Sequence, residues 1–237
     1  MNEQKGKIYL IPCTLGITPP LEVLPFLVKK AVEEIDHYIV EHEKNARAFI
    51  KAIVPQKKQP SLKFEQINKF TDTAEIPLML APCHNGFDIG VISDAGCPGI
   101  ADPGANIVAE AHLQGIKVVP LVGPSSILLA LMASGLNGQN FAFNGYLPID
   151  KQERKTEIKR LEKLSADYGQ SQLFIETPYR NEQMLESLVA ALHPQTKICI
   201  ACDITLASEF IRTLPAEVWK KNKVDLHKRP TLFIIQK

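Results

Sequence analysis

Short apolar runs alternate with segments of helical periodicity along the first half of the chain, and this alternation restricts the fold more than any other feature. The apolar runs that predict strands lie at residues 7–12, 36–41, 62–67, 88–92 and 116–120. The segments with apolar residues at helical spacing lie at 21–35, 43–54, 76–80 and 103–113. Strands separated by helices usually pair in parallel and are covered on both faces, so this half is predicted to be an α/β domain.

The pattern breaks at residues 120–124 (PLVGP), which we interpret as a linker between a domain at 1–120 and a second domain at 121–237. Helical spacing returns at residues 125–134, 152–164 and 181–192. Strand-like runs lie at 140–146, 172–176, 197–202, 208–212 and 231–235. The second half is therefore predicted to form another α/β domain, and 237 residues are enough for two domains.

The charge balance shows no global signature of a nucleic-acid-binding protein. The chain has 27 basic and 26 acidic side chains, whereas binding to many phosphates usually requires a basic surplus. A basic segment at residues 151–163 is interleaved with glutamates, which is typical of a solvated helix face with ion pairs. This overall balance is still compatible with a local basic patch.

The five cysteines do not indicate a metal site. Only Cys199 and Cys202 are close in sequence, and three positions apart on a strand they face opposite sides. No second pair follows, so we expect no metal and interpret the thiols as reduced and buried. The polar start at 1–7 lacks a signal core, and no apolar stretch reaches membrane-spanning length. These features predict a cytoplasmic protein without a membrane segment.

The most unusual segment is residues 91–104, VISDAGCPGIADPG, which follows a predicted strand and precedes a predicted helix. Ligands of open parallel sheets bind beyond the carboxyl ends of strands, where glycines allow close backbone approach. For Asp102 alone we favour a structural role as helix N-cap, with Pro103 as first helical residue. For the whole loop we favour ligand binding, because a plain connection needs fewer residues. The loop matches neither a dinucleotide-binding motif nor a P-loop.

This loop and three later stretches, GIKVVPLVGPSSILLALMASGL, FAFNGYLP and LFIETPYR, resemble the tetrapyrrole methylase superfamily. They are most similar to the branch that methylates a cytidine 2′-hydroxyl in small-subunit ribosomal RNA. The resemblance implies a two-domain fold, S-adenosylmethionine bound in a cleft between the domains, a homodimer, and the ribosomal small subunit as partner.

The resemblance also implies which residues contact the cofactor. They are Pro12, Asp94, Ala95, Gly96, Cys97, Pro98, Gly123, Ser125, Ser126, Thr177 and Pro178. Two stretches depart from the family pattern. The expected T-P-I-G-N is replaced by residues 12–17 (PCTLGI), and the expected A-E-D-T-R is replaced by residues 40–44 (VEHEK). Because these positions are expected to face the acceptor, the methyl donor is better supported than the acceptor.

A hydroxyl acceptor must lose its proton, and Glu41 and Glu176 are the candidate bases. Each is also interpretable as a salt-bridged or capping carboxylate. Arg180 is a candidate for binding a phosphate or for pairing with an acid. His42 and Tyr146 are further candidates for substrate contact, although a surface histidine and a core aromatic are the simpler interpretations.

Three functions are compatible with these features. The first is an RNA 2′-O-methyltransferase that uses S-adenosylmethionine. The second is a methyltransferase of corrin- or porphyrin-type small molecules, and the third is a cofactor-binding module without catalysis.

Overall fold

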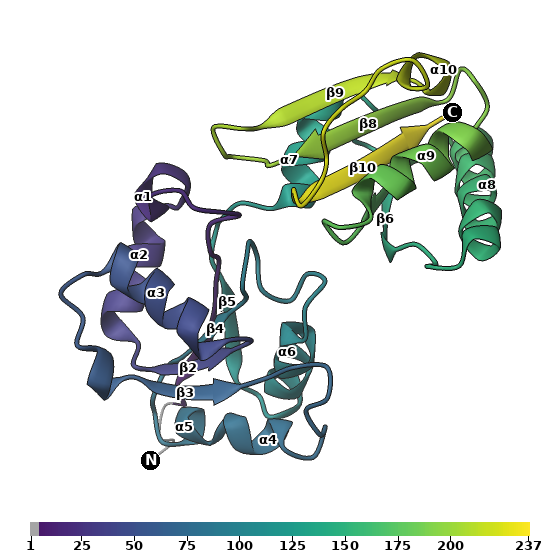
Figure 1. Cartoon of the computed structure of the whole chain (residues 1–237). Helices are drawn as coiled ribbons and strands as arrows, with labels where there is room; N and C mark the ends of the chain where they lie inside the picture. The colour runs from purple at the N-terminus through teal and green to yellow at the C-terminus, as the bar shows by residue number, and fades with distance from the viewer. Residues whose placement is uncertain (1–4) are drawn as a thin grey trace. The chain divides into compact units, whose positions relative to one another are not determined.

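The computed structural model describes residues 5–237 and divides into two compact units, the first ending at Ser125 and the second beginning at Ser126 (Figure 1). Each unit has its own sheet and its own hydrophobic core.

The first unit is built on a parallel sheet of five strands in the order β3-β2-β4-β1-β5. The strands are β1 (Lys7–Ile11), β2 (His37–Val40), β3 (Lys63–Gln66), β4 (Ile89–Ile92) and β5 (Lys117–Pro120). All neighbouring pairs run parallel, as predicted. β4 is the middle strand of this order, and all four of its residues are buried.

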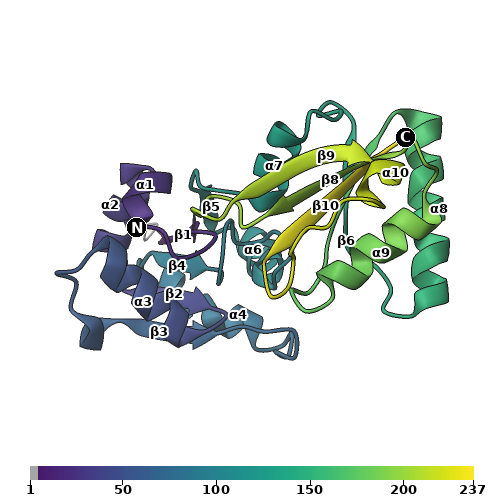
Figure 2. The same ribbon diagram turned by 45° about the horizontal axis from the view of Figure 1, so that its top comes forward.

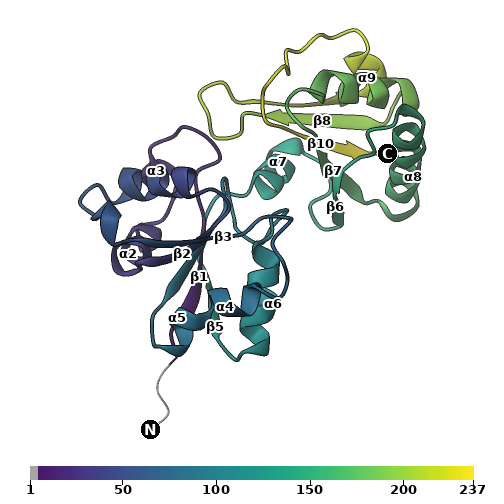
Figure 3. The same ribbon diagram turned by 60° about the horizontal axis from the view of Figure 1, so that its bottom comes forward.

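Helices cover both faces of this sheet, which confirms the predicted fold class (Figure 3). One face is covered by α2 (Phe26–Glu34) and α3 (Glu43–Ile53), with the short α1 (Pro20–Val23) against α3; the other is covered by α4 (Ile76–Met79), α5 (Ala81–His84) and α6 (Gly104–Leu113). Val28 and Ile50 pack against β1 and β2 on the first face, and Ile107 packs on the second. A 3₁₀ turn, η1 (Gln59–Ser61), precedes β3.

Two predicted elements of this unit were wrong in detail. The single helix expected at 21–35 is two helices, because Pro25 has no N–H to donate and lies in extended conformation with φ −60° and ψ 150°. The expected N-cap at Asp102 is also displaced: α6 begins at Gly104, and Pro103 occupies the N-cap position. Gly115 follows α6 with φ 63°, which confirms the predicted C-terminal cap.

The second unit has a mixed sheet in the order β6-β7-β10-β8-β9. Its strands are β6 (Phe141–Tyr146), β7 (Ser171–Ile175), β8 (Lys197–Cys202), β9 (Phe210–Pro215) and β10 (Thr231–Gln236). Only β6 and β7 are parallel; the other pairs are antiparallel. α7 (Ser126–Ser134) contacts one face, while α8 (Lys151–Tyr168), α9 (Asn181–Ala191) and α10 (Ala216–Trp219) cover the other (Figure 2).

The charged helix is longer than predicted and only partly solvated. The Asp150 side chain caps its start by accepting hydrogen bonds from Gln152 N and Glu153 N, and Gly169 ends it with φ 61°. Ion pairs such as Arg160–Glu157 confirm the solvated face. Arg154 contradicts the prediction that all the basic residues of this helix are solvated, since its side chain is 2% exposed and donates to Ile149 O at 2.8 Å.

The strand expected at 208–212 begins later, at Phe210. The Ser208 hydroxyl donates to Asp203 Oδ2 at 2.8 Å, and Thr205 N donates to Glu209 Oε2 at 2.8 Å. These bonds hold residues 203–209 in a turn, so β9 can pair with β8 only after residue 209.

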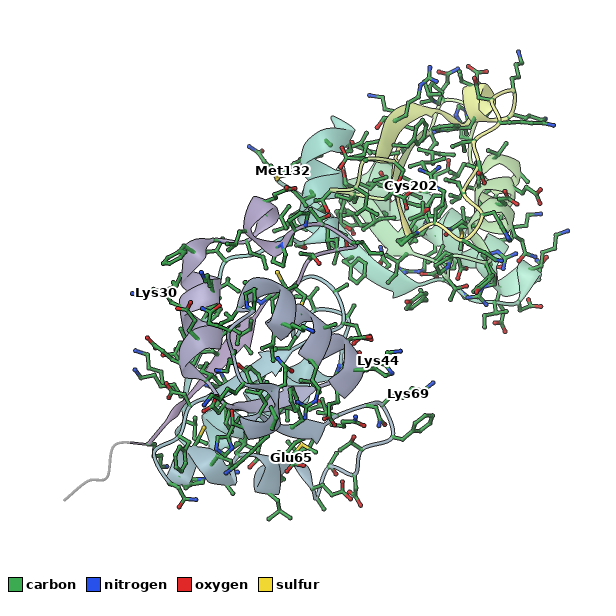
Figure 4. The ribbon with its side chains drawn as sticks, turned by 60° about the vertical axis from the view of Figure 1, so that its left-hand side comes forward. Lys30, Lys44, Glu65, Lys69, Met132 and Cys202 are labelled. Atoms are coloured by element: carbon green, nitrogen blue, oxygen red, sulfur yellow. The ribbon has the colours of Figure 1, made fainter. Side chains whose placement is uncertain are left out.

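The sheet of the second unit contains two of the cysteines. Cys199 and Cys202 lie on β8 with fully buried, unbridged thiols. Figure 4 labels Cys202 within the second unit and Met132 on α7, where it is 78% exposed. None of the described helices is both long and apolar enough to cross a membrane.

Candidate functional site

The carboxyl ends of β1, β2, β4 and β5 meet at one edge of the first sheet, because all the strands of this sheet are parallel. Residues 93–103 leave β4 at that edge and lead into α6. Ligands bind at such an edge in open α/β sheets. The edge therefore collects the residues that follow four strands into one candidate site.

The loop after β4 is joined to the loop after β1 and to the segment after β5. Cys13 N donates to Gly96 O at 2.9 Å. On the other side, the Cys97 thiol lies 3.4 Å from Pro124 O. Burial raises the pKa of the Cys97 thiol, so this side chain acts as a neutral donor and not as a thiolate. These contacts bring together three segments that are far apart in sequence.

Glycines are required at two points of this arrangement. Gly96 has φ 70°, a left-handed conformation that a residue with a side chain adopts at a cost. At Gly123, an added Cβ would lie 2.2 Å from Pro12 Cβ, closer than two carbon atoms approach without bonding. Gly123 therefore allows the chain after β5 to pass directly over Pro12.

The Asp102 carboxylate stabilises the loop through hydrogen bonds to its backbone. Its Oδ1 accepts from Gly99 N at 2.8 Å and from Gly104 N at 2.7 Å, so one carboxylate holds the loop to the start of α6. Burial raises the pKa of Asp102, while the two N–H groups oppose that rise. The structural role that we favoured for Asp102 is consistent with these bonds, although it is not the N-cap residue itself.

Two acidic side chains and a histidine meet just beyond the carboxyl ends of β2 and β4. Glu41 Oε1 accepts from Asp94 N at 3.0 Å, and His42 Nδ1 lies 2.7 Å from Asp94 Oδ2. Burial raises the pKa of Glu41, and the nearby Asp94 and Asp102 charges add to this rise against the hydrogen bond from Asp94 N. Lys44 and Lys69 follow β2 and β3, and Figure 4 shows both side chains pointing outward from this unit.

The second unit carries the remaining candidates at one edge of its own sheet. Tyr146 ends β6 beside Ile175 of β7, and its side chain is 59% exposed. Just beyond β7, Glu176 forms an ion pair with Arg180, with 2.5 Å between Oε1 and Nη2. The same Oε1 accepts from Thr177 N at 2.6 Å. Of the two interpretations of Arg180, pairing with an acid is the one seen in the structure.

Within the first unit the structure gathers most of the predicted cofactor residues at one edge. The backbone bonds and close approaches join Pro12, Asp94, Gly96, Cys97 and Gly123. Ala95 is exposed beside Asp94, and Pro98 is buried in the same loop. Ser125 and Ser126 stand where the two units join in sequence, and Thr177 and Pro178 lie in the loop after β7.

Sequence reasoning missed two contributors to this edge. Cys13 contributes its backbone N–H, a group that no side-chain pattern reveals. The pairing of His42 with Asp94 was also missed, since it joins residues 52 positions apart. The predicted parallel sheet was the available signal, because parallel strands place the residues that follow them at one edge, and the structure pairs β2 with β4.

No group of three or more histidine, cysteine or acidic side chains within residues 5–237 is arranged to hold a metal ion. A glycine- and proline-shaped loop at the edge of a parallel sheet, followed by a mixed second sheet, defines a two-unit α/β protein with a candidate nucleoside site. The family model for tetrapyrrole (corrin/porphyrin) methylases matches residues 21–218. The chain therefore belongs to this family, and the resemblance seen in the sequence is confirmed.

Curated relatives carry the name ribosomal RNA small subunit methyltransferase I. The protein of Bacillus subtilis is 31% identical over 214 residues, which are 90% of this chain and 69% of the relative. Those of Vibrio cholerae and Mesorhizobium japonicum are 35% and 39% identical over 131 and 137 residues. These alignments cover 55% and 58% of this chain, but only 44% and 45% of the relatives.

Solved structures show the same fold at low identity. The methyltransferase CobJ is 16% identical with a TM-score of 0.65, covering 98% of this chain and 94% of CobJ. Uroporphyrin-III C-methyltransferase of Thermus thermophilus, solved with S-adenosylhomocysteine, is 17% identical with a TM-score of 0.55, covering 98% of each chain. These likenesses support the two-unit α/β fold.

Proposed function

We propose that the protein is a methyltransferase that uses S-adenosylmethionine and methylates ribosomal RNA of the small subunit. Membership of the methylase family supports the reaction class, and the names of the curated relatives support the acceptor. The observation that carries the proposal is the edge of the first sheet. There, the loop after β4 is joined both to the loop after β1 and to the segment after β5.

The residues at this edge fit the cofactor. Asp94 is exposed and presents a carboxylate that can accept hydrogen bonds from hydroxyl or ammonium groups. A Cβ added at Gly99 would meet nothing within 4 Å, so the backbone is open to a ligand there. We infer that residues 94–98, Pro12 and Gly123 hold the nucleoside. Ser125, Ser126, Thr177 and Pro178 are the further residues that we expect to contact the cofactor.

When bound, the cofactor supplies an electrophilic methyl group on a sulfonium. The protein must then orient an acceptor hydroxyl in line with that group and accept its proton. We favour Glu41 as the proton acceptor, because burial raises its pKa above the ordinary value and a carboxylate with a higher pKa is a stronger base. Glu176 is less suited, because its side chain is 1% exposed and forms an ion pair with Arg180, so a substrate hydroxyl has little access to it.

The direct test is transfer of tritiated methyl groups from S-adenosylmethionine to small ribosomal subunits from a strain that lacks the gene. We expect label in ribosomal RNA at a 2′-hydroxyl. Absence of label in every RNA fraction would reject the RNA acceptor.

The main alternative acceptor is a corrin- or porphyrin-type small molecule, which the description of the family supports. Label in a low-molecular-weight fraction of the same extract, with none in RNA, would favour it. Cofactor binding without label in any fraction would favour a module without catalysis. A homodimer and a cytoplasmic location remain predictions, and sedimentation of the purified protein tests the former.

A further inference from the structure

The second unit carries a basic segment that the candidate site does not use. Residues 220–229 (KKNKVDLHKR) contain five lysine and arginine side chains and one acidic side chain, a net charge of +4 within a chain of net charge +1. Lys220, Lys221, Lys223 and Lys228 are all exposed. Within the described chain none of these four lysines has a carboxylate within ion-pair distance, whereas Arg229 pairs with Asp203 at 2.8 Å.

Hydrogen bonds hold this basic segment in place, and its last residues contact the loop after β7. The Asn181 amide, at the start of α9, donates to Arg229 O at 2.7 Å and to Leu226 O at 3.3 Å. Lys228 N donates to Pro178 O at 3.0 Å. Lys228 has φ 58°, a left-handed conformation that a non-glycine residue rarely adopts and that surrounding contacts must hold.

The C-terminal end of the basic segment lies beside an exposed aromatic ring. Tyr179 is 73% exposed, with Lys228 Nζ 5.9 Å from its ring centroid and the His227 ring 6.4 Å away. Tyr179 directly follows Thr177 and Pro178, which we expect to contact the cofactor. Tyr146 is a second exposed ring at the same edge, since it ends the strand paired with β7.

Exposed rings beside unpaired cations are the surface that single-stranded nucleic acid binds. Bases stack on the rings, and lysines follow the phosphates. Three carboxylates also lie along this surface. Glu182 and Glu186 line a pocket of about 650 Å³ together with Lys220 and Lys223, and Asp225 lies within the segment. These carboxylates reduce the net positive charge of the surface, but among the residues that the structure describes none of them forms an ion pair with the four lysines.

We propose that Lys220, Lys221, Lys223 and Lys228 form a track for single-stranded RNA that ends with a base stacked on Tyr179. The proposal rests on the RNA acceptor proposed above and adds where that acceptor docks. A nucleotide held on Tyr179 would lie beside the residues expected to close the cofactor site.

The test is fluorescence anisotropy of a labelled mixed-sequence single-stranded RNA at several NaCl concentrations. The variant K220Q/K221Q/K223Q/K228Q is compared with K151Q/K155Q/K163Q/K197Q, which removes the same charge from exposed lysines elsewhere in this unit. We expect the track variant to lower the slope of log affinity against log salt by up to about 3, at about 0.7 per lost phosphate contact, and the control variant to leave it unchanged. Equal slopes for the two variants would overturn the proposal.

Tyr179→Ala should weaken RNA binding about 5- to 150-fold, the range for loss of one stacked base, while Tyr179→Phe retains affinity. Equal affinity of both variants with the wild type would overturn the stacking step. Melting temperatures of all variants exclude loss of folding. If the wild type methylates RNA but the track variant has the same slope of log affinity against log salt as the wild type, the track is rejected and the proposed function stands. If the track is confirmed by the slopes but no RNA is methylated, the proposed function fails and the docking surface stands.

Discussion

Glu41 Oε1 accepts a hydrogen bond from Asp94 N at 3.0 Å, and this bond joins the end of β2 to the loop after β4. The two residues are 53 positions apart, and parallel pairing of β2 with β4 brings them together. The bond uses one carboxylate oxygen of Glu41. Its other oxygen is therefore the one available to a substrate proton.

Glu41→Gln is the sharpest test of the proposed base. The glutamine carbonyl can still accept from Asp94 N, so the loop is retained while the proton acceptor is lost. We expect kcat for RNA methylation to fall about 100-fold or more, with little change in cofactor affinity. Glu176→Gln is the comparison, and an equal fall in kcat in that variant alone would assign the base to Glu176 instead.

The same substitution predicts a pH dependence of stability. Burial raises the folded-state pKa of Glu41 above its ordinary value of 4.5, so the folded protein binds this proton more tightly than the unfolded chain does. The contribution of Glu41 to the free energy of unfolding therefore falls as pH rises from its unfolded to its folded pKa. Glutamine carries no such proton. We expect the stability of Glu41→Gln relative to wild type to increase across that window in urea titrations; a difference that stays constant with pH would contradict the shift.

Gly123→Ala tests the close passage over Pro12. The added Cβ would lie 2.2 Å from Pro12 Cβ, so the segment after β5 must move. We expect a loss of about 1–3 kcal/mol in the free energy of unfolding and weaker cofactor binding. Gly138→Ala is the matched control, since a Cβ there meets nothing within 4 Å. Similar stability of the two variants would show that the passage is not tight.

Arg154→Ala tests the buried guanidinium of α8. The substitution leaves Ile149 O without its 2.8 Å partner and the Ser187 hydroxyl without its 3.1 Å partner. It also opens space in a position that is 2% exposed. Denaturant unfolding should show a loss of about 2–4 kcal/mol. Lys155→Ala, one residue further along the same helix, should change stability by less than about 0.5 kcal/mol.

Local patterns were sufficient to predict the order of strands and helices in the first unit. Apolar runs and helical spacing reflect which side chains are buried, and the parallel sheet follows from their alternation. The special geometry of residues 93–104 was also readable, because glycine and proline mark unusual backbone wherever they cluster. The break at Pro25 was readable by the same rule, although helical spacing on both sides obscured it.

Contacts between distant residues could not be predicted in this way. Arg154 has the same charge and helix as its solvated neighbours, and only the tertiary structure brings Ile149 O and Ser187 to its guanidinium. The turn at 203–209 depends on a side-chain bond between Ser208 and Asp203 that competes with strand pairing. The pairing of His42 with Asp94 likewise requires the sheet to exist first.

The most direct measurement is calorimetric titration of S-adenosylhomocysteine into the wild-type protein, Asp94→Asn and Glu65→Gln. Glu65 is an exposed carboxylate on β3, away from the loop after β4. We predict saturable binding to the wild type, weakening of about 10- to 150-fold in Asp94→Asn through loss of a charged hydrogen-bond acceptor, and no change in Glu65→Gln. Absence of binding to the wild type, or equal affinity of all three proteins, would contradict a cofactor site at residues 93–104.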